Sequence, residues 1–402
     1  MNSRDPWKIV YLLAFTQIVS WGSLYYAFAI VAQDIQAELG WRTEIVFGAF
    51  SWSLLVAGLA STPAGVLIDR FGGRPVMGVG SLVSGLGMIG IGLAHSVALY
   101  FAAWTAVGAG MAMVLYEAAF ATINREFLLN ARKGMSVLTL FGGLASTVFW
   151  PLTLKLNSML GWRDTYLIYG LVHLAMCVPL HAMLHAGERR RAEAATQTAR
   201  DYTLHEAVRD PVFWKLAFAF ATNMFVFSAM SVHLIPMLQR FGHSATTAVL
   251  VAALIGPMQV AGRIGEMTLA RHVRPQNVGK FTFAVLPAGL MALLFLGEHQ
   301  FAVAAFCIFY GVSNGVLTIV RGTVPQALFG RENYGAISGA LAGPSLLAKA
   351  AGPLVAAAIV EANPSPAWLL GVLLAVAIIS LACFLAAVNA RRDGLPLTGA
   401  AE

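Results

Sequence analysis

The sequence predicts an all-α membrane protein in which twelve transmembrane helices form two pseudo-symmetric six-helix bundles. The 402-residue chain is 58% hydrophobic and only 11% charged, whereas an average soluble domain is about 25% charged. Apolar stretches of roughly 20 residues, long enough to cross a bilayer, recur along the whole chain. Short motifs also recur at a nearly constant offset. These observations exclude an ordinary soluble protein.

The predicted spans are helices, because none of them shows the roughly ten-residue alternation of membrane β-strands. Glycine and proline within several spans are tolerated, since neighbouring helices satisfy the freed backbone groups. The first span follows the charged start MNSRDPWK. It lacks a small-residue cleavage site, so we interpret it as a retained helix rather than a signal peptide. The spans are 9–32, 45–67, 76–94, 97–121, 135–156, 164–184, 212–238, 246–270, 277–297, 301–325, 335–360 and 367–389.

Basic residues in the loops predict the orientation. With the N-terminus inside, the inner loops and tails carry 17 basic residues, and the outer loops carry only Arg42, Arg163 and Arg240. Both termini are therefore expected in the cytoplasm. The net charge of +7 is a topology signal and does not indicate nucleic-acid binding. All three cysteines fall within spans, so neither a disulfide framework nor a metal site is expected.

The longest loop divides the chain almost in half. We expect an N-terminal six-helix bundle over 1–184, a cytoplasmic linker loop over 185–211 and a C-terminal six-helix bundle over 212–402. The end of the loop, DYTLHEAVRDPVFW, predicts a short surface helix, with Leu204, Ala207 and Val208 on one face.

The two halves resemble each other in sequence. Gly65, Arg74 and Pro75 recur 200 residues later, at 265, 274 and 275. The segment AGMAMVLYE (109–117) aligns with NGVLTIVRG (314–322), at an offset of 205 residues. Each match is weak alone, but the nearly constant offset and the equal helix counts favour two parallel six-helix repeats.

The segment GVLIDRFGGRP (65–75) resembles the signature between helices two and three of the major facilitator superfamily. The resemblance implies that fold, and it implies that this loop gates transport. Gly65 allows close helix packing, Gly72 makes the turn, and Asp69 can cap a helix start or meet an arginine when the inner side closes. Arg70 completes the charged pair of the motif, and Arg74 is the basic residue on the inner face.

Three further stretches resemble the monocarboxylate transporter family and its bacterial relatives. They are WGSLYYAFAIVAQDIQAELGWRTEIVFGAFS (21–51), TLHEAVRDPVFWKL (203–216) and QVAGRIG (259–265). The resemblance implies secondary active transport of a small organic anion across a bacterial inner membrane. Major facilitators are mostly monomers, so we expect a monomer here. The family's acidic residue one turn before the helix-eight arginine is Gln259 here, and we expect Gln259 to line the binding site.

Charged residues inside the spans are the candidate binding residues. Each basic side chain at the bilayer centre costs roughly 2.5–3.5 kcal/mol on insertion scales, so it should face a cavity or a partner. Arg263, Arg321 and Lys349 are such residues. The planar fork of an arginine binds a carboxylate with two hydrogen bonds. We therefore expect these three residues to bind the anion. The alternative is internal pairing, of Arg263 with Glu266 and of Arg321 with Glu117.

Glu117 is the candidate for proton coupling. An anion that competes for a nearby arginine would release the Glu117 carboxylate to take a proton, so that one anion and one proton move together. Snorkelling of Glu117 at the end of helix four is the alternative. His233, toward the outer side, is a second candidate, as a pH-sensitive gate or merely an interfacial histidine.

In this superfamily, helices one, four, seven and ten line the cavity. Their aromatic and amide side chains suit a small polar ligand, although the same residue types also serve to pack membrane helices. Tyr25, Tyr26, Tyr116 and Asn314 are the expected contributors, together with Gln17, Trp21 and Asn223.

The sequence contains no phosphate-binding loop, no zinc-binding His/Glu spacing and no Gly-x-Ser-x-Gly motif, so we expect neither an enzyme nor a cofactor. Two alternatives to anion transport remain open. The first is export of drugs or other apolar compounds, which the run GGLASTVFWPLT (142–153), with a single proline behind Trp150, disfavours. The second is a membrane sensor that binds a ligand without moving it.

Overall fold

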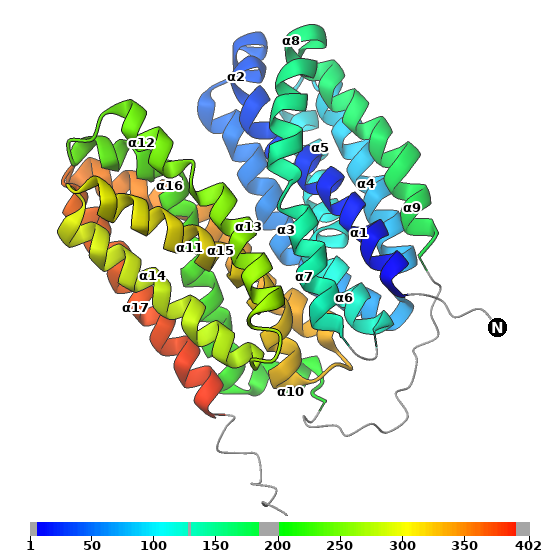
Figure 1. Cartoon of the computed structure of the whole chain (residues 1–402). Helices are drawn as coiled ribbons and strands as arrows, with labels where there is room; N and C mark the ends of the chain where they lie inside the picture. The colour runs from blue at the N-terminus through cyan, green and yellow to red at the C-terminus, as the bar shows by residue number, and fades with distance from the viewer. Residues whose placement is uncertain (1–5, 128–129, 185–200, 391–402) are drawn as a thin grey trace, which may run out of the picture. The chain divides into compact units, whose positions relative to one another are not determined.

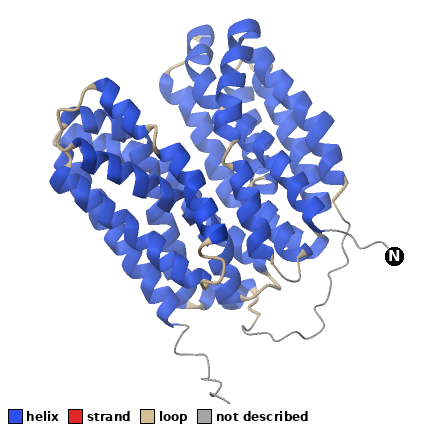
Figure 2. Cartoon of the chain, viewed as in Figure 1, coloured by secondary structure: helices blue, strands red, loops and turns tan. Residues whose placement is uncertain are grey.

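The computed structural model describes residues 6–127, 130–184 and 201–390, and these residues form helices joined by turns, without a β-strand (Figure 2). The predicted all-α class is confirmed. The elements of the described chain are α1 (Pro6–Trp21), η1 (Gly22–Tyr26), α2 (Phe28–Leu39), α3 (Thr43–Phe71), α4 (Gly73–Gly92), α5 (Val97–Val114), α6 (Tyr116–Glu126), α7 (Ala131–Gly142), α8 (Ala145–Val172), η2 (His173–Cys177), α9 (Val178–Ala182), α10 (Leu204–Arg209), α11 (Pro211–Arg240), α12 (Ala245–Ala252), α13 (Ile255–Thr268), α14 (Pro275–Leu296), α15 (Gln300–Phe329), α16 (Tyr334–Ala362) and α17 (Pro366–Ala390).

Eleven continuous stretches of the described chain are long and apolar enough to cross a membrane. One of them, Ala131–Ala182, has 52 residues, more than twice the length that a bilayer requires. Gly161 interrupts it, with φ 82° and ψ 168°, a left-handed conformation that glycine adopts at little cost. The stretch is therefore two spans, and the twelve predicted helices are present.

The chain divides into two compact units. Unit 1 comprises Met1–Thr198 and Arg331–Leu347, and unit 2 comprises Ala199–Gly330 and Ala348–Glu402. Helix α16 therefore contributes its first turns to unit 1 and the remainder to unit 2, whereas the sequence repeat alone assigns all of 212–402 to the second bundle. Residues 185–200 of the predicted linker lie outside the described part of the chain.

In unit 1, α4 packs along α5 and α8, α3 packs along α5, and α1 packs along α7 (Figure 1). Glycines bring some of these helices into backbone contact. A Cβ atom on Gly108 of α5 would lie 2.3 Å from the carbonyl oxygen of Ser53 on α3. Such small-residue contacts are a main source of helix association in membranes, where burying apolar surface from lipid gains little.

In unit 2, α15 packs along α13 and α14, and α17 packs along α11 and α14 (Figure 1). Phe283 of α14 stacks on Phe384 of α17 with ring centroids 4.2 Å apart and an interplanar angle of 11°. The Phe384 ring occupies the space beside Gly279, where a Cβ atom would come within 2.2 Å of it.

The short helix predicted at the end of the linker is confirmed as α10. Thr203 and Glu206 form a capping box at its start, in which each side chain accepts the backbone N–H of the other residue. The exposed fraction of Ala207 is 0%, so one face of α10 is packed inward. Asp210 then caps α11 by accepting the N–H of Val212 at 2.8 Å.

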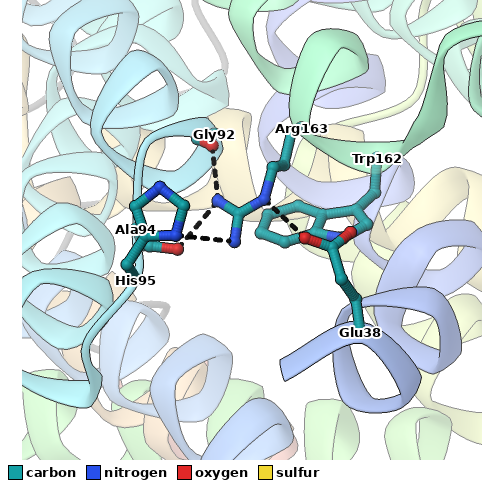
Figure 3. A network of polar contacts seen from close by, with 6 residues as sticks. All are labelled: Glu38, Gly92, Ala94, His95, Trp162 and Arg163. Atoms are coloured by element: carbon teal, nitrogen blue, oxygen red, sulfur yellow. Dashed lines mark hydrogen bonds and ion pairs between the residues drawn. The ribbon is translucent and has the colours of Figure 1, made fainter. Parts of the chain in front are cut away.

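Arg163 of α8 forms hydrogen bonds with the end of α2 and the end of α4 in unit 1 (Figure 3). Its guanidinium donates to the Glu38 carboxylate at 2.7 Å and to the carbonyl oxygens of Gly92 and Ala94, both at 2.8 Å. It also lies over the Trp162 ring, 4.4 Å from the ring centroid. The ends of α2 and α4 are thereby held beside α8.

Candidate functional site

Arg263 lies on α13, inside an apolar span, and only 6% of its surface is exposed. Its Nε atom is buried and has no hydrogen-bond partner in the described chain. No hydrogen bond or ion pair joins Arg263 to any described residue, including Glu266 one turn further along. Glu266 is itself buried, 3% exposed. The side chain thus carries a positive charge inside unit 2 without a counter-ion among the described residues.

Gln259 lies four residues before Arg263, and residues at this spacing share one face of a helix. The backbone of α13 contacts α15 beside this face. A Cβ atom on Gly262 would lie 2.7 Å from the Val312 carbonyl oxygen, and one on Gly315 would lie 2.2 Å from the Gln259 carbonyl oxygen. The half-buried Asn314 is the residue of α15 directly before this contact.

The other predicted basic residues of unit 2 lie on α15 and α16. Arg321 is half-buried, and its Nη1 atom is 3.5 Å from the sulfur of Met224 on α11. Lys349 is half-buried on α16, and its carbonyl oxygen accepts a hydrogen bond of 2.5 Å from the Ser228 hydroxyl. His233 donates from Nε2 to the Pro353 carbonyl oxygen at 3.1 Å, which joins α11 to α16.

Tyr25 and Tyr26 lie on η1, one turn of π-helix within the first span. The turn is closed by a bond from the Ala27 N–H to the Gly22 carbonyl oxygen, five residues back, at 2.9 Å. Gly22 allows the approach of Phe149, whose ring atoms would lie 2.1 Å from a Cβ atom there. Single π-turns inside α-helices occur frequently at functional sites.

The tyrosines belong to a larger aromatic cluster. The Trp21 ring lies 5.6 Å from that of Tyr25, 6.3 Å from that of Tyr26 and 5.0 Å from that of Tyr116. Tyr25 also contacts Phe50 of α3, at 5.5 Å. The three tyrosines expected to line the cavity are therefore brought together in unit 1, around Trp21.

The fourth span is broken at this cluster. Leu115 is extended, with φ −79° and ψ −167°, and it separates α5 from α6. Tyr116 and Glu117 are the first residues of α6 and are both half-buried. The break places Glu117 in the first helical turn, where a carboxylate interacts favourably with the helix dipole.

The signature loop joins α3 to the beginning of α16 within unit 1. The Asp69 carboxylate accepts the backbone N–H groups of Gly335 at 3.0 Å and of Ala336 at 2.7 Å. Gly72 has φ 86° and forms the turn between α3 and α4. Arg70 lies over the Phe71 ring, 5.0 Å from its centroid, and Arg74 is exposed.

Two further arginines, Arg125 and Arg331, bind backbone carbonyl groups beside the signature loop, and the sequence analysis did not identify them. Arg125, at the end of α6, donates to the carbonyl oxygen of Asp69. Arg331 donates to the carbonyl oxygens of Asn124 and Phe127, and the Asn124 amide donates back to the Arg331 carbonyl oxygen at 3.1 Å. The two arginines are 206 residues apart (331 − 125), so the repeat offset is the signal that could have found them.

Two wholly buried histidines of the sixth span were also missed. His181 lies between Ser81, 2.7 Å from Nδ1, and Thr16, 3.0 Å from Nε2. His173 lies 3.0 Å from the Ser23 hydroxyl. No sequence signal distinguishes them from interfacial histidines. In the described chain, no group of three or more His, Cys, Asp or Glu side chains could hold a metal ion.

The arrangement of twelve apolar helices and the signature loop has a known counterpart. The family model described as Major Facilitator Superfamily matches residues 10–343. The chain belongs to the major facilitator superfamily. The resemblance that the segment 65–75 carries is thereby confirmed.

Relatives of this major facilitator include transporters of the monocarboxylate branch. Monocarboxylate transporter 4 of Mus musculus is 29% identical over 339 residues, which cover 78% of this chain and 69% of that protein. The oxalate:formate antiporter of Oxalobacter formigenes is 28% identical over 199 residues, 48% of this chain and 47% of the antiporter. The solved structure of the fucose:proton symporter FucP of E. coli matches with a TM-score of 0.71 at 12% identity, covering 95% of this chain and 98% of FucP, and supports the fold.

Proposed function

We propose that this major facilitator is a secondary active transporter of a small, monocarboxylate-like organic anion, and that the carboxylate of the anion binds Arg263. The observation that carries the proposal is the buried guanidinium of Arg263, which has no counter-ion or hydrogen-bond partner in the described chain. An uncompensated charge inside a membrane bundle is costly, and a bound anion would offset that cost.

Further positive charge in unit 2 favours an anion over a cation. Besides Arg263 on α13, α15 carries Arg321 and α16 carries Lys349, each within an apolar span. Arginine forms bidentate hydrogen bonds with carboxylates, while lysine provides a compact charge. Two relatives, a monocarboxylate transporter and an oxalate:formate antiporter, agree with a carboxylate substrate.

Glu117 is the proton-carrying group in this proposal. It is the acidic residue of the broken fourth span and lies in the first turn of α6. Protonation of its carboxyl would accompany movement of the anion, so that no net charge crosses the membrane. We place the protein in a bacterial inner membrane as a monomer with both termini in the cytoplasm, as the loop charges favour.

Substitutions at Arg263 test the proposal in proteoliposomes with an imposed pH gradient. Arg263→Lys keeps the charge but loses the two-bond fork. Loss of one charge-assisted hydrogen bond costs roughly 1.5–3 kcal/mol, so anion affinity should fall about ten- to hundredfold. Arg263→Gln should abolish uptake and still insert, because removing the charge relieves the insertion cost. Arg271→Gln, at an exposed arginine after α13, is the matched control and should transport normally.

A ligand screen separates an organic anion from other substrate classes. Purified protein should be stabilised against heat by small organic acids, since a ligand that binds the folded state raises the melting temperature. The acids should not stabilise Arg263→Gln. Stabilisation by amines or dyes, with no effect of any acid, would overturn the organic-anion assignment. Normal acid transport by Arg263→Gln would remove Arg263 from the site.

A further inference from the structure

Gln17 is a buried amide in the middle of the first span. Its exposed fraction is 0%, and its Nε2 atom donates to the carbonyl oxygen of Val114 at 2.6 Å. The amide orientation follows from this contact, because the opposite orientation would place two acceptor oxygens against each other. The Oε1 atom is buried without a hydrogen-bond partner in the described chain. An apolar side chain would avoid that desolvation cost, so packing alone does not explain a glutamine here.

The carbonyl group that Gln17 binds is freed by the break in the fourth span. In a continuous α-helix, the Val114 carbonyl oxygen would accept the N–H of Ala118, four residues later. The extended conformation of Leu115 ends α5 at Val114 and starts α6 at Tyr116. A backbone group freed inside a membrane needs another partner, and the Gln17 amide supplies it.

The break sets the direction of the first side chains of α6. The Tyr116 ring lies 5.0 Å from that of Trp21 and is stacked on Phe120 at 5.5 Å with an interplanar angle of 8°. The Tyr116 hydroxyl occupies the space beside Gly142, where a Cβ atom would come within 2.5 Å of it. Closing the break would continue α5 through Leu115 and rotate Tyr116 and Glu117 away from these positions.

We propose that Gln17 is a positioning residue: its amide holds the fourth span open at Leu115 and thereby orients Tyr116 and Glu117 for transport. The part of this proposal that concerns transport rests on the proposed role of Glu117. The part that concerns the break does not, because it depends on the contact between Gln17 and Val114 alone.

The test uses a resonance from Tyr116 itself. The protein is labelled with 3-fluorotyrosine, and its fluorine NMR spectrum is recorded without substrate. The Tyr116 resonance is the one missing from Tyr116→Phe. Gln17→Leu and Gln17→Met remove the donor, and both should shift this resonance by more than its linewidth. Uptake driven by a pH gradient should fall at least tenfold.

Two further variants separate positioning from packing. Ser20 is also wholly buried in the first span, and its hydroxyl has no hydrogen-bond partner in the described chain. Ser20→Ala is therefore the matched control and should change neither the resonance nor uptake. In Gln17→Leu/Ala118→Pro, residue 118 has no N–H with which to close the helix on Val114. This double variant should return the Tyr116 resonance toward its original position and recover part of the uptake.

The outcomes are distinguishable. A Tyr116 resonance that stays in place in both donor-less variants overturns the proposal, whatever the substrate is. A shifted resonance with undiminished uptake overturns the role in transport. If Gln17→Leu and Gln17→Met do not fold, a folded double variant supports the proposal and an unfolded one overturns it. The shift of the Tyr116 resonance depends neither on Arg263 nor on the substrate, so a failure of the anion assignment would be seen separately.

Discussion

Gly65 of α3 and Gly335 of α16 lie backbone against backbone in unit 1. A Cβ atom on Gly65 would come within 1.9 Å of the Gly335 carbonyl oxygen. One turn further along α3, the Asp69 carboxylate accepts the N–H of the same Gly335 at 3.0 Å. The signature segment therefore joins α16 in two ways, with a small residue that permits contact and a carboxylate that binds the helix start.

Gly65→Ala should disrupt this contact. The backbone of Gly335 cannot move aside as a flexible side chain can, so we expect a loss of about 1–3 kcal/mol of stability, as for other overpacked sites. Gly78→Ala on α4 is the control, because a Cβ atom there meets nothing within 4 Å. The measurement is the melting temperature of both variants in detergent. Equal melting temperatures would show that the Gly65 contact contributes nothing.

Arg163→Lys should destabilise the α2–α3 end of unit 1 although it keeps the charge. A lysine ammonium cannot reproduce the planar set of bonds to Glu38, Gly92 and Ala94. We expect a loss of about 1–3 kcal/mol, the cost of leaving buried carbonyl groups unpaired. Arg42→Lys is the control, since the side chains of the Arg42–Glu44 ion pair are 79% and 71% exposed and exposed pairs contribute little to stability. Similar losses in both variants would contradict this account.

His181→Leu should lower stability because it removes the link between three spans. The Ser81 hydroxyl, 2.7 Å from Nδ1, would be left buried without that partner, at a cost of about 1–3 kcal/mol. His272→Leu, at an exposed histidine, should have no effect. Thermal unfolding followed by fluorescence checks both. If His181→Leu leaves the melting temperature unchanged, apolar packing of the leucine fully replaces the hydrogen bonds of His181.

Glu117→Gln should retain anion binding and anion exchange but lose uptake driven by a pH gradient, because the amide cannot carry a proton. Counterflow and gradient-driven uptake are measured on the same vesicles. Undiminished gradient-driven uptake would remove Glu117 from the coupling mechanism. His233, which donates to the Pro353 carbonyl oxygen, would then be tested next.

Cysteine labelling checks the orientation. In a variant without the native cysteines, a cysteine at residue 160 should react with an impermeant reagent from outside intact cells, and one at residue 272 should react only after the cells are opened. Both positions are exposed in the structure. The opposite pattern would reverse the topology and contradict the loop-charge argument.

The spans could be predicted from the sequence because their cause is the bilayer, which requires long apolar segments whatever their neighbours are. The charge of Arg263 within an apolar run stands out for the same reason, and its role in anion binding stays a prediction. The signature segment was identified as a motif, but its partners on α16 were not. Contacts such as Asp69 with Ala336 join residues 267 positions apart, and no local pattern encodes them.

The irregular turns could not be predicted. The residues around Leu115 and those of η1 include no proline, so the local sequence does not indicate a departure from the α-helix. Both departures lie at contacts between residues far apart in the sequence, namely the Gln17 amide at Val114 and the Phe149 ring beside Gly22. The aromatic cluster was therefore expected only as a set of residue types, without the geometry that assembles it.

The π-turn at Gly22–Tyr26 predicts how the sequence of this chain aligns with those of its homologues. A turn closed by an i to i+5 bond contains one more residue than an α-helical turn, and one residue corresponds to a rotation of about 100° around the helix axis. The residues before and after η1 are therefore out of phase by that angle. A homologue with an unbroken first helix should align with this chain only through a one-residue gap between positions 22 and 26. Such a gap would mark the turn as an insertion event.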